Sequence, residues 1–200
     1  MAGGGCSNGE IHIMTEGYGL DRFVADMRAV TAETSDDGEI VSRLKPLAIR
    51  LAQDKSWLKP EHRECNNAQA AAVYLLHEEP DHSLAVFSSA YAAGRGFPPH
   101  DHGTWAIVAG VEGTEMDTYW RRTDDGSREG YAELERGTET AVEAGSAVAM
   151  VTGEIHSVEN RTDRTSISVH VYGRHVGFID RSQFDPETNV QEPFQVAFED

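Results

Sequence analysis

The sequence predicts a mainly β domain, a small barrel or sandwich, preceded by helices. Three observations carry this prediction. Roughly the first sixty residues show apolar residues at helical spacing, and from about Ala71 onward short runs rich in β-branched and aromatic residues alternate in polarity. Turn signals separate these runs at roughly ten-residue intervals. Because no linker divides the 200 residues, we expect one structural domain, with an N-terminal tail and helical cap over 1–66 and a barrel over 67–200.

Two helices are expected in the cap. The apolar stripe of the first contains Leu20, Phe23, Val24, Met27 and Val30. The stripe of the second contains Ile40, Val41, Leu44, Leu47, Ala48 and Leu51. Ser35 or Asp36 can cap this second helix, and Pro46 should kink or break it near Leu44, because proline lacks a backbone N–H.

Short strands are expected through the rest of the chain. They are predicted near residues 71–78, 83–91, 104–111, 115–122, 130–136, 139–143, 147–151, 155–160, 165–172 and 176–180. Many short strands at even spacing are typical of a barrel whose interior holds the functional side chains.

Composition argues against several classes of partner. The chain has 34 acidic and 17 basic residues, a net charge of −17, so it repels nucleic acid and anionic lipid surfaces. It shows neither an apolar run of about 18 residues nor a signal-peptide pattern at Met1, and we therefore predict no membrane association and a cytoplasmic location. Cys6 and Cys65 have no cysteine neighbours at metal-ligand spacing, which argues against a disulfide scaffold or a zinc ribbon.

Three histidines form the most informative pattern. His100 and His102 are separated by one residue, so on an extended segment both side chains point to the same face and can reach one metal ion. His156 follows about fifty residues later, in a similar setting of glycines. A lone His-x-His is weak evidence, but the flanking residues strengthen it.

Those flanks resemble the two motifs of the cupin superfamily. The first comprises Gly94, five residues, His100, one residue, His102, three residues, Ala106, six residues and Gly113. The second comprises Gly145, five residues, Val151, Thr152, Gly153, two residues, His156, three residues and Asn160. The resemblance implies a double-stranded β-helix barrel, with His100, His102 and His156 projecting inward to bind a metal.

Ala106 stands where many cupins place a glutamate ligand. Three neutral imidazoles leave the full 2+ charge on an ion, so such a centre favours anionic co-ligands, for example a thiolate together with a reduced oxygen species. The alternative is that Glu112 or Glu115, just beyond the motif, supplies the carboxylate after all.

The predicted strand 165–172 carries a second polar group. Ser168, His170 and Tyr172 alternate along it and share one face, whereas the opposite face is apolar. Inside a barrel these groups would satisfy one another as a relay, because an unpaired buried hydroxyl or imidazole costs about 1–3 kcal/mol. The alternative is that this face is the solvent side of an edge strand.

Taken with the motifs, this strand resembles the thiol dioxygenases, the cysteine dioxygenase family, and in particular its bacterial 3-mercaptopropionate branch. The similarity covers roughly residues 55–195. It implies an enzyme with iron(II) on His100, His102 and His156, which adds both atoms of O2 to the sulfur of a small thiol to give a sulfinate. It also implies that Tyr172, oriented by His170 and Ser168, acts beside the metal, without the cysteine cross-link of animal enzymes.

The substrate pocket departs from this family. The resemblance places an arginine or glutamine that binds the substrate carboxylate near Ala72 or Val73, and an apolar wall cannot replace it. Either a basic group takes over from another wall or the thiol lacks that carboxylate. The pocket candidates are Gln69, Arg95, Arg174 and Trp105.

Three functions therefore remain open. The first is the iron(II) thiol dioxygenase, with a small thiol and O2 as partners and a monomer or small homo-oligomer as the expected state. The second is a non-catalytic cupin module that binds a metal or ligand. The third is a cupin oxygenase that acts on a non-thiol substrate.

Overall fold

The computed structural model describes residues 17–65 and 71–199. The elements are α1 Leu20–Glu33, α2 Asp37–Asp54, a 3-10 turn at Pro60–Arg63, β1 Ala72–Glu78, β2 Ala85–Tyr91, β3 Gly96–His100, β4 Ala106–Glu112, β5 Thr114–Arg122, β6 Leu134–Glu143, β7 Ala147–Met150, β8 Ile155–Glu159, β9 Ser166–Tyr172, β10 Ser182–Asp185 and β11 Val190–Pro193. The predicted mainly β class with N-terminal helices is confirmed.

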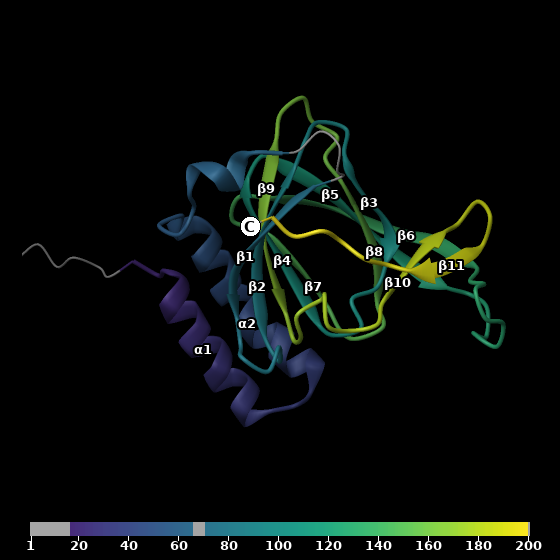
Figure 1. The fold of residues 1–200 in the computed structure, drawn as a ribbon, viewed down its shortest axis with the longest axis horizontal. Helices are drawn as coiled ribbons and strands as arrows, with labels where there is room; N and C mark the ends of the chain where they lie inside the picture. Colours follow the sequence, from purple (N-terminus) through teal and green to yellow (C-terminus); the bar gives the residue numbers. More distant parts are fainter. Residues whose placement is uncertain (1–16, 66–70, 200) are drawn as a thin grey trace, which may run out of the picture.

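Two antiparallel sheets form the barrel (Figure 1). One has the strand order β1-β2-β9-β4-β7 and the other the order β11-β10-β3-β8-β5-β6. The chain passes repeatedly from one sheet to the other between β2 and β9, which is the winding of the double-stranded β-helix expected for a cupin fold.

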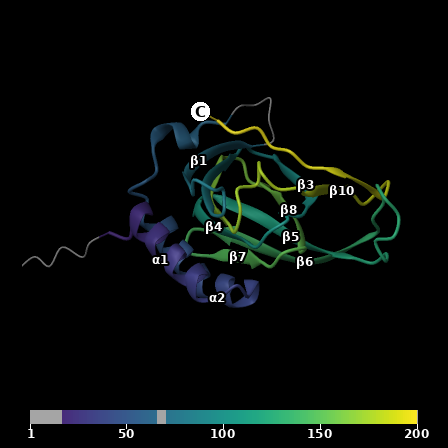
Figure 2. The ribbon, with the colours of Figure 1, turned by 60° about the horizontal axis from the view of Figure 1, so that its bottom comes forward.

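The two helices cover the outer face of the first sheet (Figures 1 and 2). Their apolar stripes pack on Ile107 of β4 and on Ile167 and Val169 of β9, so helices and sheet share one core. The expected boundary between residues 66 and 67 falls outside the described residues. Across the stretches that are described, neither helix combines the length and the apolar character needed to cross a membrane.

The helix α2 begins where the sequence predicts, but it does not end where the sequence predicts. Asp36 caps the helix by accepting a hydrogen bond from the backbone N–H of Glu39 at 2.8 Å. Of the predicted kink or break near Leu44, the break is wrong, because one helix runs through Pro46 to Asp54. Burial of the stripe on both sides of Pro46 stabilises the helix against the loss of one backbone hydrogen bond.

Several strand predictions are also corrected. Residues 130–136 and 139–143 do not form separate strands, because β6 is continuous over Leu134–Glu143. Residues 176–180 form turns and bends rather than a strand. The strands β3, β10 and β11 were not predicted, because the prolines of β3 and the polar residues of β10 and β11 give no alternating apolar pattern.

The last residues return across the barrel. From β11 the chain runs back to β1, where the backbone N–H of Glu199 donates to the carbonyl of Val73 at 2.8 Å (Figure 1). On the way, Phe194, Val196 and Phe198 turn toward the barrel interior, where they form part of a cavity wall. This C-terminal segment therefore closes one side of that cavity.

Candidate metal centre

The two sequence motifs meet inside the barrel. His100 ends β3 and lies opposite His156 of β8 in the antiparallel register, and His102 follows two residues after His100. All three side chains are buried, and each offers a ring nitrogen within 4.8 Å of the other two. The Nε2 atoms of His102 and His156 are 3.2 Å apart.

Two of the three imidazole rings are held by hydrogen bonds at Nδ1, the ring nitrogen that does not face the other histidines. Nδ1–H of His100 donates to the carbonyl of Pro98 at 2.8 Å, and Nδ1–H of His156 donates to the carboxylate of Asp117 at 2.6 Å. Because carbonyl and carboxylate oxygens only accept, both histidines carry their proton on Nδ1 and present Nε2 with its lone pair. Such support is characteristic of metal-binding histidines.

The residues fit a divalent transition metal. Burial, and then the neighbouring histidines, hold the pKa values of His100 and His102 well below the usual range, so both are neutral, the form that binds metal. The Nε2 atoms of His102 and His156 lie within hydrogen-bond distance, 3.2 Å, so Nε2–H of His102 can donate to His156. A bound cation would take the place of that proton between the two nitrogens.

Neither neighbouring glutamate joins the three histidines. Glu112 lies at the surface, where Arg63 binds it at 2.9 Å and Lys55 at 3.4 Å. Glu115 is buried, but it does not belong to the histidine group. Within the part of the chain that the structure describes, the candidate metal site is therefore composed of histidine alone.

The polar face of β9 points into the barrel and forms a chain of hydrogen bonds. Ser168 Oγ lies 2.9 Å from His170 Nε2, and His170 Nδ1 lies 2.9 Å from the Tyr172 hydroxyl. The ring of Tyr172 packs 5.1 Å, centroid to centroid, from that of His102. β9 lies between β2 and β4, so it is a central strand and not the solvent-facing edge considered from the sequence.

Burial determines the protonation states of His170 and Tyr172. It lowers the pKa of His170 to about 3, with a smaller contribution from His156, so the imidazole is neutral. It raises the pKa of Tyr172 to about 12, although the positive charge of Arg181 acts in the opposite direction. At neutral pH Tyr172 is thus a phenol that can donate a hydrogen bond.

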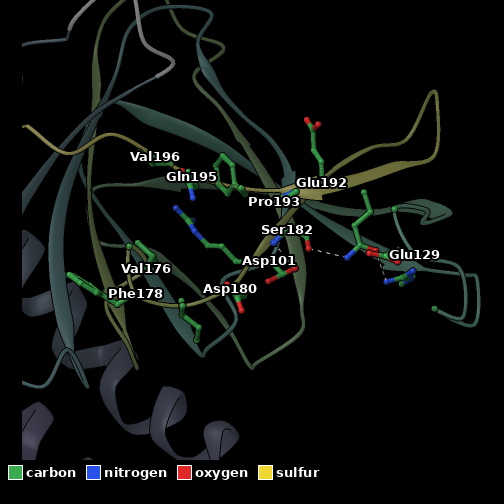
Figure 3. Close-up of a pocket in the computed structure, with 18 of the residues that line it drawn as sticks. Asp101, Glu129, Val176, Phe178, Asp180, Ser182, Glu192, Pro193, Gln195 and Val196 are labelled. Carbon is green, nitrogen blue, oxygen red and sulfur yellow. Dashed lines mark hydrogen bonds between the residues drawn. The ribbon is translucent and has the colours of Figure 1, made fainter.

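A small cavity adjoins the histidines and shares part of its wall with a larger pocket. Its wall includes His100, His156, Tyr172, Val73 and Phe87, and its free volume of about 20 Å³ has room for one water-sized group. The outer pocket has a volume of about 930 Å³. Both spaces are bounded by Val176, Arg181, Phe194, Val196 and Phe198. Figure 3 shows the outer pocket, with Val176 and Val196 on one side of it and Glu129 on the other.

Arg181, which the sequence analysis did not single out, lies in the shared wall. Its side chain is buried, and its guanidinium carbon lies 4.4 Å from the ring centre of Phe194. Within residues 17–65 and 71–199, its Nε and one Nη atom have no hydrogen-bond partner. Burial lowers its pKa, partly offset by Tyr172 and Asp101. Arg181 directly precedes β10, a strand without an apolar pattern, so the local sequence did not indicate that its side chain is buried in a pocket wall.

Three of the four predicted pocket residues, Trp105, Arg95 and Arg174, lie elsewhere. Trp105 packs in the core beneath the helices, because it alternates with Ala106 and so faces away from the barrel interior. Arg95 is exposed in the turn before β3, and Arg174 is exposed and donates to the carbonyl of Phe178. Gln69 lies outside the described residues. Val73 does line the cavity, and it gives that wall an apolar surface.

Asp117 was also missed. Its position two residues after Glu115 predicts that the two carboxylates share a face of the strand, but the sequence does not say that this face is the interior. The pairing of β5 with β8, in which Asp117 lies opposite Val158, brings it beside His156.

Comparisons with known proteins find only low similarity. No family model matches the chain. Oxalate oxidase in complex with glycolate shares 20% identity over 56% of this chain and 56% of its own, with a TM-score of 0.43. A cupin superfamily protein from Desulfitobacterium hafniense shares 10% identity over 55% of this chain and 81% of its own, with a TM-score of 0.40. A protein with a double-stranded β-helix domain from Klebsiella pneumoniae shares 14% identity over 68% of this chain and 93% of its own, with a TM-score of 0.42. The chain thus spans about half the length of oxalate oxidase.

Proposed function

We propose that the protein is an iron(II)-dependent thiol dioxygenase that acts on a small thiol. The observation that carries the proposal is that one cavity is lined both by His100 and His156 of the buried histidine group and by His170 and Tyr172, which Ser168 extends through a hydrogen bond to His170. A histidine-only site leaves more positive charge on an ion than a site with a carboxylate, and this charge suits an anionic thiolate. Iron(II), held by His100, His102 and His156, would supply a centre where thiolate and dioxygen react.

The proposed reaction needs no further reductant. A thiolate and O2 give a sulfinate, in which both oxygen atoms are bonded to sulfur. The sulfur loses four electrons and the two oxygen atoms gain four, so electrons and atoms balance.

Tyr172 is the residue proposed to act on the reacting groups. It lies in the cavity wall, remains protonated at neutral pH, and is held from behind by His170. Its hydroxyl can therefore donate a hydrogen bond to negative charge that develops during oxygen transfer. Ser168 acts through His170 and is a positioning residue.

Arg181 supports a substrate that carries a carboxylate. A buried guanidinium with unused N–H groups is costly unless an anion pairs with it. Since the inner cavity is small and Arg181 lines both the inner cavity and the outer pocket, the thiol end of a substrate would fit beside the histidines and its carboxylate beside Arg181. We therefore propose a short mercapto acid as the substrate class, and Arg181 as the basic group that replaces the expected anchor near Val73.

The test is oxygen consumption by iron-loaded protein with cysteine, 3-mercaptopropionate, mercaptosuccinate and cysteamine. We expect uptake with at least one mercapto acid, with one sulfinate formed for each O2 consumed, and little uptake with cysteamine. The His156→Ala variant is the matched negative control. Absence of thiol-dependent uptake across the panel, from protein that holds one iron per chain, would overturn the proposal.

A further inference from the structure

Glu115 is a buried carboxyl group that the proposed chemistry does not yet use. It lies on β5 with only 1% of its surface exposed. Neither of its carboxylate oxygens has a hydrogen-bond partner of good geometry in residues 17–65 and 71–199. Buried carboxyl groups are normally paired, because an unpaired charge in the protein interior is strongly unfavourable. The burial of Glu115 without a partner is therefore unfavourable unless its carboxyl group is neutral.

The groups around Glu115 favour its neutral form. Burial raises its pKa to about 8, Asp117 on the same strand adds to this effect, and the Ser168 and Ser166 hydroxyls of β9 partly oppose it. Tyr91 of β2 also lies close enough that Glu115 raises the pKa of its phenol. None of these neighbours is a cation, so Glu115 is mostly protonated at neutral pH.

Ser168 connects Glu115 to the rest of the site. The serine hydroxyl faces Glu115 closely enough to influence its pKa, and the same oxygen lies 2.9 Å from His170 Nε2. His170 in turn contacts the Tyr172 hydroxyl through Nδ1. Glu115 therefore lies next to Ser168, at the end of the Ser168–His170–Tyr172 hydrogen-bonded chain that is far from Tyr172.

The hydrogen bonds along these four side chains can all donate in one direction or all in the other. If Glu115 is protonated, it donates to Ser168, Ser168 donates to His170 Nε2, and Nδ1–H of His170 donates to the Tyr172 oxygen. The Tyr172 proton is then directed toward the cavity. If Glu115 is ionised, Ser168 donates to it and every bond reverses, so that Tyr172 donates to His170. The reversal moves the His170 proton from Nδ1 to Nε2 and releases one proton from the chain.

We propose that Glu115 is a positioning residue whose protonation state sets the tautomer of His170 and thereby the direction in which the Tyr172 hydroxyl donates. Its expected effect on turnover rests on the proposed function, whereas the chain itself can be observed without substrate. Turnover should fall as Glu115 ionises, by about tenfold for each pH unit above its pKa, because Tyr172 then no longer donates into the cavity.

The test compares wild-type protein with Glu115→Gln in the metal-free and zinc-loaded forms. The glutamine amide donates to Ser168 at every pH and so imitates the protonated carboxyl. We expect the wild type to show the infrared C=O band of a protonated carboxyl that disappears near pH 8, together with a His170 tautomer change, seen by 15N NMR, over the same range. Both changes should be absent in Glu115→Gln. Glu143→Gln, an exposed change on the neighbouring strand β6, should retain them.

Two results would overturn the inference: a carboxyl band that persists unchanged in Glu115→Gln, or a His170 tautomer that does not follow the titration of that band. Should Glu115→Gln fail to fold, Glu115→Leu replaces it, because an apolar residue of similar size also removes the band. With the iron-loaded enzyme, turnover of Glu115→Gln should lose the wild-type decline above about pH 8. If no thiol is oxidised, the proposed function fails, but the spectroscopic results still decide the role of Glu115.

Discussion

The Asp117 carboxylate accepts a hydrogen bond from Nδ1–H of His156 at 2.6 Å, in the barrel interior. This contact fixes the tautomer and the ring orientation of a proposed metal ligand and makes its Nε2 a stronger donor to a cation. Partners of this kind contribute to metal binding although they do not touch the metal.

We predict that Asp117→Asn weakens iron(II) binding by about 10–100-fold, because the neutral amide keeps the shape but not the charge of the carboxylate. Metal affinity is measured by competition with a chelator. Asp163→Asn, at a side chain that is 94% exposed, is the control and should leave the affinity unchanged. Equal affinity in both variants would contradict a supporting role for Asp117.

Tyr172→Phe should lower kcat by at least about tenfold while iron remains bound, because the hydroxyl is proposed to assist the reaction and is not a ligand. Turnover and iron content are measured on the same preparation. Tyr119→Phe, at an exposed tyrosine of β5, should retain full turnover. Loss of iron from Tyr172→Phe would mean that this residue supports the metal site instead.

Arg181→Met should raise KM for mercapto acids by about 10–100-fold, because it removes a charge-assisted hydrogen bond worth about 1.5–3 kcal/mol. The KM for cysteamine, which has no carboxylate, should not rise. Steady-state oxygen uptake gives both values, with Arg174→Met as the control at an exposed arginine nearby. An equal rise in KM for acids and for cysteamine would exclude a carboxylate-binding role.

The buried histidine of the relay should make stability depend on pH. An unfolded histidine titrates near pH 6.5, whereas His170 in the fold titrates at about 3. Between these values the unfolded chain binds the additional proton, so His170 lowers the free energy of unfolding as pH falls from about 6.5, by about 1.4 kcal/mol per unit. Denaturant unfolding of metal-free wild type and His170→Gln should show the variant losing less stability on acidification. A difference that stays constant with pH would contradict this prediction.

The helices and the central strands could be predicted because their patterns are local. The stripe from Phe23 to Val30 and the alternation along β9 follow from helical and strand periodicity. β10 could not be predicted, because it forms through backbone pairing with β3 and β11, and its own side chains give no pattern. Trp105 was assigned to the pocket from its neighbours in the sequence, although its alternation with Ala106 turns it toward the helices.

By itself, the sequence determined the spacing of the three histidines and the common face of Ser168, His170 and Tyr172, because strand geometry fixes which side chains share a face. Only the tertiary structure decided that this face is the interior, and that Asp117, Glu115 and Arg181 surround it. These three residues come from the strand β5 and from the segment before β10, far in sequence from the residues they face. Their roles arise from the packing of two sheets and from the loss of water around buried charges, and neither is a property of a local pattern.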